Sequence, residues 1–455
     1  MSADLQPRPV RRASYPPREG NLIRVLIDGE ETFGRIFDVV ESARESVWIT
    51  VSFTQIDVVL PGRNESFLDL VSRAAASGID VRLLFWWSEY TGIGSFRGDS
   101  EEIAMLQARR CGVKMRWDAV PRGCHHQKSY VVDRNVAFVG GLNLTAEAMS
   151  SAAHVTRDFH DVFTELRGPV VADVTHNFAQ RWNQASVTRE RRHAFPSIED
   201  ADDLDEEIAP GEPAGRSSLQ LVRTLRRDLY RGTAGWSTGD RFDLAAGEES
   251  IRLAVLEAIG AAREAIYIEN QFLMDPETID ALAAAAQRGA EVTCVVPLEP
   301  DPNLLLYPQD HMRATRAALA QLGTVENVGL FGLVHEAEPE RPIYVHSKTL
   351  VVDDRLLHVG SANLWPPSYW RDSELTVVAW DAPLAEDTRR RLWREHLLGR
   401  DAAGLDDWRR FAREDHAARR AGRAASTRLV EIDPTRYYVF ADGSSAPWQS
   451  IRESA

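Results

Sequence analysis

One sparse polar pattern occurs twice in this chain of 455 residues, and the second copy follows the first at a constant offset of 220 residues. Each copy contains a histidine, a lysine two positions later, an aspartate, a pair of small residues and an asparagine. A pattern this sparse rarely recurs by chance at one offset, so we infer two repeats that each supply half of one site. The members are His126, Lys128, Asp133, Gly140, Gly141 and Asn143 in the first copy, and His346, Lys348, Asp353, Gly360, Ser361 and Asn363 in the second.

The segments around the polar pattern repeat as well. ARESVWITVSF at 43–53 matches AREAIYIENQF at 262–272, and both are rich in the β-branched and aromatic residues of buried strands. Apolar residues at helical spacing, as at 33–40, predict helices between the strands. Alternating strands and helices predict an α/β fold. We therefore expect two pseudo-twofold-related α/β lobes with one active site at their interface.

The length of the chain exceeds what one compact core usually supports. We expect a disordered tail at 1–20, a first lobe at 21–195, an acidic linker at 196–218, a second lobe at 219–400, and a C-terminal helix and loose tail at 401–455. The linker prediction follows from seven acidic residues among the nine at 199–207, after which glycine and proline appear.

Charge and composition restrict the class of protein. A formal net charge of −15 disfavours a protein that wraps nucleic-acid phosphates, so we expect no nucleic-acid partner. The three cysteines lack C-x-x-C spacing, which suits a reducing compartment. No stretch has the apolar length of a membrane span, and residues 1–20 lack the apolar core of a signal peptide. We expect a cytoplasmic protein that contacts membranes only peripherally.

The spacing within each copy predicts phosphoryl chemistry. Histidine and lysine stand two apart in a strand-like run, so their side chains share one side, and a turn at 134–135 or 354–355 returns the asparagine to them. Neutral imidazole can attack phosphorus, and protonated imidazole can supply the leaving alcohol with its proton. Lysine and asparagine donate to the phosphate oxygens. We therefore expect a phosphohistidine intermediate, with no metal and no other cofactor.

Other polar residues near the motifs have simpler interpretations. A single His-x-Lys pattern is usually a pair of exposed surface residues without a function. Its duplication here, with matching glycine and asparagine in both copies, favours a catalytic role. Asp133 and Asp353 stand beside a turn with the opposite strand parity, so we assign them mainly to structure, as turn caps or buried ion pairs. His125 is out of register with His126, and we expect it to pack or to form a hydrogen bond.

The doubled H-x-K-x4-D with a trailing G-[GS]-x-N resembles the phospholipase D superfamily over nearly all of residues 21–400. The segments YVHSKTLVVDD, VGSAN, RDSELTVV and IYIENQF look like the eukaryotic-type phospholipase D catalytic core, without a preceding PX or PH domain. The resemblance implies that His126 is the nucleophile and that His346 is the general acid, then the general base. Lys128, Lys348, Asn143 and Asn363 would hold the phosphate.

The family also places a carboxylate behind each histidine, as the aspartate of a catalytic triad does. Glu374 in RDSEL is the candidate in the second repeat, 28 residues after its histidine. Asp161 in FHDV is the candidate in the first repeat, 35 residues after its histidine.

The resemblance leaves the reaction open among several substrates. We expect first the hydrolysis of a glycerophospholipid such as phosphatidylcholine, at a membrane surface, to phosphatidic acid and free headgroup. The alternative is phosphatidyl transfer, by a cardiolipin synthase-like enzyme or a transphosphatidylase, because only the incoming alcohol differs. A nuclease is less expected. Aromatic residues near the motifs could hold a choline headgroup or simply pack; they are Trp86, Trp87, Tyr90, Trp365, Tyr369 and Trp370.

Overall fold

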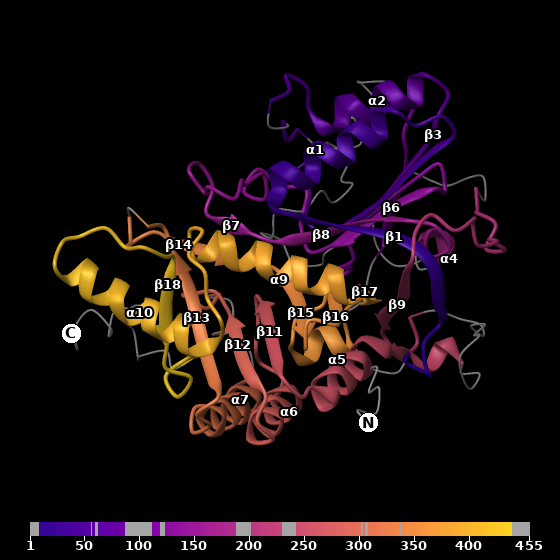
Figure 1. Ribbon diagram of the computed structural model, residues 1–455. Helices are drawn as coiled ribbons and strands as arrows, with labels where there is room; N and C mark the ends of the chain where they lie inside the picture. The colour runs from indigo at the N-terminus through magenta and orange to yellow at the C-terminus, as the bar shows by residue number, and fades with distance from the viewer. Residues whose placement is uncertain are drawn as a thin grey trace.

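The chain forms two α/β lobes that face each other across a shared interface (Figure 1). The computed structural model describes residues 9–55, 57–59, 62–86, 112–118, 123–187, 202–229, 243–301, 304, 308–336 and 338–438. Each lobe is built on one mixed sheet, and the strands follow the same spatial order in both. The predicted α/β fold with two related lobes is confirmed.

In both sheets three parallel strands adjoin an antiparallel region, and the motif hairpin lies in the middle. The first sheet runs β4 (Lys114–Asp118), β3 (Asp80–Trp86), β2 (Ser46–Val51), β5 (Ser129–Val132), β6 (Val136–Gly140), β8 (Val162–Arg167) and β1 (Pro17–Ile27). The second runs β13 (Val328–Val334), β12 (Glu291–Val295), β11 (Ala265–Asn270), β15 (Lys348–Val352), β16 (Leu356–Gly360), β17 (Glu374–Trp380) and β9 (Ser217–Leu225). Shorter strands are β7 (Phe159–His160), β10 (Glu248–Glu249), β14 (Pro342–Val345) and β18 (Leu429–Ile432).

Strand β1 joins the two sheets. Its later residues pair with β8, whereas Pro17, Arg18 and Asn21 pair with β9 across a bulge. Residues before β1 are also ordered: Val10 is buried, and its backbone N–H donates to the side chain of Gln220. The prediction of a disordered tail is therefore wrong for residues 9–20, because apolar side chains in this stretch pack on the second lobe.

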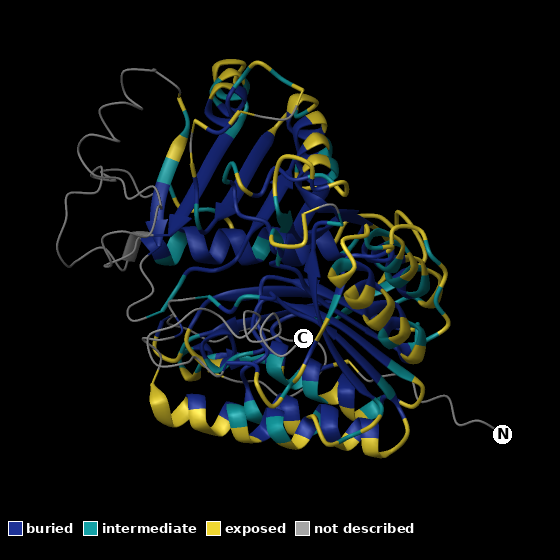
Figure 2. Cartoon of the chain, turned by 90° about the vertical axis from the view of Figure 1, so that its left-hand side faces the viewer, coloured by how far each residue is buried: buried dark blue, intermediate teal, exposed yellow. Residues whose placement is uncertain are grey.

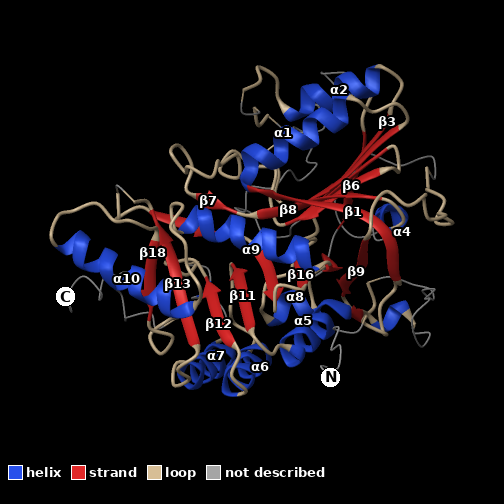
Figure 3. Ribbon diagram, in the orientation of Figure 1, coloured by secondary structure: helices blue, strands red, loops and turns tan. Residues whose placement is uncertain are grey.

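Helices form an outer layer on each sheet and a shared layer between the sheets (Figures 1 and 3). The outer helices are α1 (Asp28–Glu41) and α2 (Phe67–Ala76) on the first sheet, and α5 (Ser250–Ala261), α6 (Pro276–Gln287) and α7 (Gln309–Leu322) on the second. The inner helices are α4 (Val170–Val187) and α9 (Ala382–His396), with α10 (Leu405–Arg420) beside the second sheet and the short η1 (Leu244–Ala246) and α8 (Pro366–Trp370) in loops. None of the described helices is both long enough and apolar enough to cross a bilayer.

Burial follows these layers. The described residues form one hydrophobic cluster under the outer helices of each lobe and a third between the two sheets. Helix α1 buries the predicted stripe of Phe33, Ile36, Phe37 and Val40, and each such side chain contributes about 1.5–3 kcal/mol on burial. In Figure 2 most of the strands are dark blue, whereas outer helices show exposed residues on one face. The central cluster holds the lobes together and closes the interface to water.

The linker and the C-terminal region both pack on the lobes. In the described part of the acidic segment, Asp202 forms ion pairs with Arg82 at 3.2 Å and with Lys114 at 2.8 Å, both in the first lobe.

Strand β18, in the C-terminal region, extends the second sheet by antiparallel pairing with β13. Tyr437 and Tyr438 are buried. The expected loose tail therefore does not begin within residues 429–438, because these residues complete a sheet edge and cover apolar surface.

The motif aspartates hold the hairpin turns. Asp133 and Asp353 have φ near +50°, and each is followed by a residue in the same left-handed conformation. The carboxylate of Asp353 accepts hydrogen bonds from the backbone N–H groups of residues 263–265, at 2.8–2.9 Å for the closest contacts. Asp133 accepts from residues 44–46 in the same way. Both aspartates thus tie a hairpin to the start of its neighbouring strand and take no part in the polar site.

Replacing Asp353 by Ala is expected to lower the free energy of unfolding by about 2–4 kcal/mol. Three backbone N–H groups lose their acceptor, and alanine disfavours the left-handed conformation. Urea denaturation measures the change. Asp353→Asn is the control, because asparagine tolerates positive φ and keeps one acceptor oxygen. Equal losses in the two variants would contradict this assignment.

Candidate active site

The two motif hairpins meet at the lobe interface. His126 and Lys128 immediately precede β5, and His346 and Lys348 lie at the start of β15. Their exposed fractions are 8%, 0%, 5% and 4%, respectively. The four groups are near enough for the charges of both lysines and of His126 to lower the pKa of His346, in addition to the larger effect of burial. The two repeats therefore bring their polar motifs to one shared location.

Backbone hydrogen bonds cross the interface at both histidines. The N–H of His126 donates to the carbonyl of Ser373 at 2.9 Å, and the N–H of Ser373 donates to the carbonyl of Cys124 at 2.9 Å. The N–H of His346 donates to the carbonyl of His160 at 2.8 Å, beside the parallel pair of β7 and β14. Each histidine is thus held in a strand-like pair with the opposite lobe.

The carboxylates behind the two histidines also come from the opposite lobes. Nδ1 of His126 lies 3.0 Å from Oε2 of Glu374, and Nδ1 of His346 lies 2.6 Å from Oδ2 of Asp161. We predicted the opposite pairing, within each repeat, from spacing along the chain, and that prediction is wrong. The interlobe backbone pairs place each carboxylate beside the histidine of the other lobe. With Nδ1 occupied, Nε2 of each ring is left for a substrate.

The two carboxylates have unequal surroundings. Glu374 accepts hydrogen bonds from the hydroxyl groups of Ser361 at 2.5 Å and Ser368 at 2.6 Å. Asp161 has Gly141 at the position that corresponds to Ser361, and a Cβ atom there would lie 2.3 Å from its Oδ1. A glycine at position 141 is therefore required for the carboxylate of Asp161 to fit. It also leaves Asp161 without the hydroxyl donor that Glu374 has at this position.

This difference separates the protonation states. Burial opposes the ionisation of Glu374, but His126, Lys128 and the Ser361 hydroxyl outweigh it and lower the pKa of this carboxyl. Burial raises the pKa of Asp161 to about 7. Burial also lowers the pKa of His126. Near neutral pH the His126–Glu374 pair is therefore a neutral imidazole with a carboxylate, whereas Asp161 is partly protonated beside His346.

The lysines are poised to receive an anion. Burial lowers the pKa of Lys128 to about 8 and that of Lys348 to about 7. A bound phosphate would raise both pKa values by its charge and so favour the ammonium forms. Lys348 Nζ and Asn363 Nδ2 both donate to Oε1 of Gln271, at 3.0 and 3.2 Å. Asn143 Oδ1 accepts the backbone N–H of Phe53 at 3.4 Å.

Sequence reasoning missed two of these contacts. Gln271 lies in the repeated segment 262–272, but Ser52 occupies the matching place in the first repeat, so duplication did not mark it. Ser368 follows the motif in the short helix α8, which has no periodic pattern in the sequence. His125 is buried with Nδ1 3.2 Å from the Asp118 carboxylate, which agrees with a hydrogen-bonding role.

Three of the four aromatic candidates that the structure describes pack within the lobes. Tyr369 is fully buried, with its hydroxyl 3.1 Å from that of Thr278. Trp365 packs on Phe272 and donates to Ser368 Oγ at 2.9 Å. Trp370 is 50% exposed. Trp86 is buried, and Trp87 and Tyr90 lie outside the described residues.

Comparison with known families agrees with this geometry. A family model described as "Cardiolipin synthase, PLD-like domain" matches residues 36–182 and 255–395, which is more than half of the chain. The chain belongs to the phospholipase D superfamily. A second model, described as "Phospholipase D", matches residues 148–299. Membership supports phosphodiester chemistry at the paired motifs.

Curated relatives include cardiolipin synthases and a phospholipase D. Cardiolipin synthase A of Pseudomonas entomophila is 26% identical over 90% of this chain and 74% of its own length. Cardiolipin synthase A of Pseudomonas putida is 25% identical over 86% of this chain and 72% of its own length. Phospholipase D A of Dictyostelium discoideum is 25% identical over 84% of this chain, which spans only 36% of that relative.

A solved structure supports the superfamily fold. The phosphatidylserine synthase of Haemophilus influenzae superimposes with a TM-score of 0.57 over 82% of this chain and 86% of its own length, at 14% sequence identity. Sequence identity at this level shows the fold alone.

Replacing Glu374 by Gln is expected to change the imidazole resonances of His126 and to lower its pKa further, because a facing negative charge is lost. Replacing Asp161 by Asn is expected to act on His346 instead. Nitrogen-15 NMR of labelled histidines measures both effects, and each variant is the control for the other. A response of His346 to Glu374→Gln, with His126 unchanged, would contradict the exchanged pairing.

Proposed function

We propose that the chain is a phosphatidyl transferase that moves a phosphatidyl group from one phospholipid to the hydroxyl of an acceptor alcohol. The cardiolipin synthases among the relatives support transfer over the hydrolysis that the sequence suggested first, and they match most of this chain. By analogy with those relatives, the preferred acceptor is a hydroxyl of a second phospholipid such as phosphatidylglycerol.

The first half of the reaction forms a phosphohistidine. Nε2 of His126 attacks phosphorus as a neutral nucleophile, while Nδ1 donates to the ionised Glu374. The bond from phosphorus to the leaving alcohol oxygen breaks, and His346 gives that oxygen a proton. Lys128 and Lys348 stabilise the charge that develops on the non-bridging oxygens.

The second half reverses these roles. His346, now neutral, accepts the proton of the incoming hydroxyl, whose oxygen attacks phosphorus and displaces Nε2 of His126. The product is the new phosphodiester, and both histidines return to their starting protonation states. Water in place of the alcohol would give phosphatidic acid. The low exposure of both imidazoles, 8% and 5%, supports transfer because it limits the access of bulk water.

One observation carries this proposal. Two buried histidines from different repeats face one location, and each has a carboxylate from the other lobe at Nδ1. The pKa of Glu374, beside His126, is lowered, whereas that of Asp161, beside His346, is raised to about 7. This inequality supports His126 as the nucleophile and places the proton source on the side of His346.

A lipid assay distinguishes transfer from hydrolysis. With phosphatidylglycerol vesicles, the expected products by mass spectrometry are cardiolipin and free glycerol in equal amounts. With phosphatidylcholine vesicles and a primary alcohol, the expected product is the phosphatidyl alcohol. Phosphatidic acid as the main lipid product in both arms would support a hydrolase instead. Absence of turnover with either lipid would contradict the proposal.

Two histidine variants test the order of steps. His126→Ala is expected to lose at least about 1,000-fold in transfer, as removal of a catalytic nucleophile does. His346→Asn is expected to accumulate phosphohistidine, because the base for the acceptor is lost. A neutral-pH quench and mass spectrometry of the peptide with His126 detect it. His176→Ala, on α4, is the control variant. Phosphate found on residue 346 in the wild-type chain would reverse the assignment.

A further inference from the structure

A second buried polar cluster lies beside the active site. Asp28 begins α1, His154 and His160 flank the start of β7, and Glu395 is near the end of α9. Asp28, His154 and His160 are fully buried, and the side chain of Glu395 is 6% exposed. One nitrogen or oxygen atom from each residue lies within 4.8 Å of the corresponding atoms of the other three. The cluster therefore joins both lobes at one point.

Atoms in this cluster lack hydrogen-bond partners despite their burial. Nδ1 of His160 lies 3.0 Å from Oδ1 of Asp28 and 3.0 Å from Oε1 of Glu395, yet it makes no aligned hydrogen bond. Oδ2 of Asp28 also has no partner. Leaving such groups unsatisfied costs about 1–3 kcal/mol each. His154 Nε2 and Glu395 Oε1 are hydrogen-bonded to each other at 3.0 Å, so the unpaired atoms at this point are His160 Nδ1 and Asp28 Oδ2.

The spacing of the four groups fits a tetrahedral ion. At Zn–ligand distances near 2.1 Å, the edges of a tetrahedron are roughly 3.4 Å. The contacts of His160 Nδ1 with Asp28 Oδ1 and Glu395 Oε1 are 3.0 Å, and that of His154 Nε2 with Glu395 Oε1 is also 3.0 Å. His154 Nε2 approaches the other oxygen of Asp28, Oδ2, at 3.8 Å, so the carboxylate of Asp28 would turn to present one oxygen to both histidines.

An outer carboxylate supports the same interpretation. Nε2 of His160 lies 2.9 Å from Oε2 of Glu269, a carboxylate that would hold the Nε2–H tautomer once Nδ1 binds a cation. Glu269 is held in turn by the Tyr267 hydroxyl at 2.6 Å and by His396 at 2.7 Å. A carboxylate behind a ligating histidine is the usual arrangement in protein metal sites.

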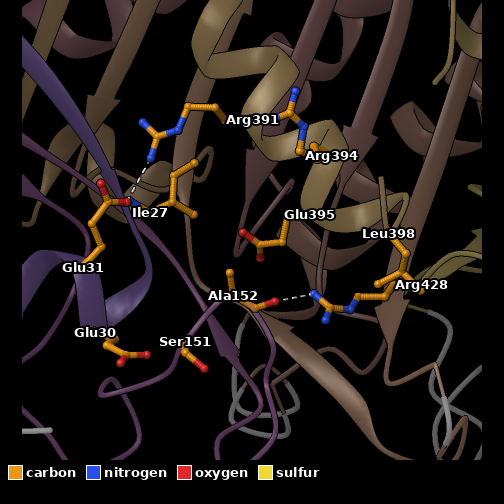
Figure 4. A pocket seen from close by; sticks show the side chains of 10 residues that line it. All are labelled: Ile27, Glu30, Glu31, Ser151, Ala152, Arg391, Arg394, Glu395, Leu398 and Arg428. Atoms are coloured by element: carbon orange, nitrogen blue, oxygen red, sulfur yellow. Dashed lines mark hydrogen bonds and ion pairs between the residues drawn. The ribbon is translucent and has the colours of Figure 1, made fainter. Parts of the chain in front are cut away.

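A surface cleft of about 600 Å³ reaches this cluster. Figure 4 shows Glu395 among the side chains that line the cleft, together with Glu30, Glu31 and Ser151. The cleft therefore offers a path from solvent to one of the four groups. Three glutamates and three arginines line the cleft, so its charges balance and it contributes access alone.

We propose that Asp28, His154, His160 and Glu395 bind a divalent transition-metal ion, with Zn²⁺ the best fit to two imidazoles and two carboxylates. The sequence contains no motif for this site because its ligands are spread from residue 28 to residue 395. The ion would tie α1 and β7 of the first lobe to α9 of the second.

The bound ion would also stabilise the segment that holds His346, the proposed general acid. Asp28 and Asp161 exchange two hydrogen bonds, from Asp28 N to Asp161 O at 2.9 Å and from Asp161 N to Asp28 Oδ1 at 3.2 Å. The carbonyl of His160 holds the backbone of His346. The ion thus has a structural and positioning function and takes no part in the transfer chemistry.

Metal content tests the site independently of activity. The full chain is stripped with chelator, dialysed against micromolar Zn²⁺, and analysed by inductively coupled plasma mass spectrometry, with its melting temperature followed in parallel. We expect one Zn²⁺ per chain and a rise in melting temperature that saturates at one equivalent. Loading with Co²⁺ should give the visible absorption of tetrahedral coordination.

Variants locate the ion. His154→Ala and the more conservative Glu395→Gln should each lose the bound ion and the thermal shift. His126→Ala and His176→Ala, both outside the cluster, should keep them. Failure of the folded wild-type chain to retain Zn²⁺ would overturn the proposal. Retention by Glu395→Gln and His154→Ala, or loss in His126→Ala, would place the ion elsewhere and would also overturn it.

Discussion

The exchange of hydrogen-bonding partners between the lobes is the interaction on which the site depends. His126 is held by Ser373 and Glu374, and His346 is held by His160 and Asp161. Neither lobe alone supplies a histidine together with its carboxylate. The buried layer of α4 and α9 between the sheets keeps the lobes in register for this exchange. Association of the repeats is therefore a condition for chemistry as well as for stability.

Duplication supplies two similar half-sites, and the reaction needs them to differ. A symmetrical pair of imidazoles would have equal pKa values and no preferred nucleophile. The difference between Gly141 and Ser361 breaks this symmetry, because only Glu374 receives a hydroxyl hydrogen bond from that position. This substitution between the repeats adds to the difference in pKa between Glu374 and Asp161, to which burial, His126 and Lys128 contribute more.

Burial provides most of the electrostatic tuning. It lowers the pKa values of His126, His346, Lys128 and Lys348 and raises that of Asp161. Charged groups tolerate such burial only where they are paired or await a ligand of opposite charge. The lysines await the phosphate. The cluster around His160, which lies behind the acid, has the corresponding excess of carboxylates for a cation.

The sequence by itself determined the duplication, the α/β layering, the hairpins and the His–Lys pairs, because these depend on periodicity and on residue types close together in the chain. It also marked Asp133 and Asp353 as turn residues. Only the tertiary structure decided which carboxylate serves which histidine. The paired side chains are 248 positions apart in the chain for His126 and Glu374, and 185 positions apart for His346 and Asp161. Packing between segments that are far apart in the chain also decided three further features. Residues 9–20 take a defined structure, β18 joins the second sheet, and Asp28 meets Glu395 in one cluster.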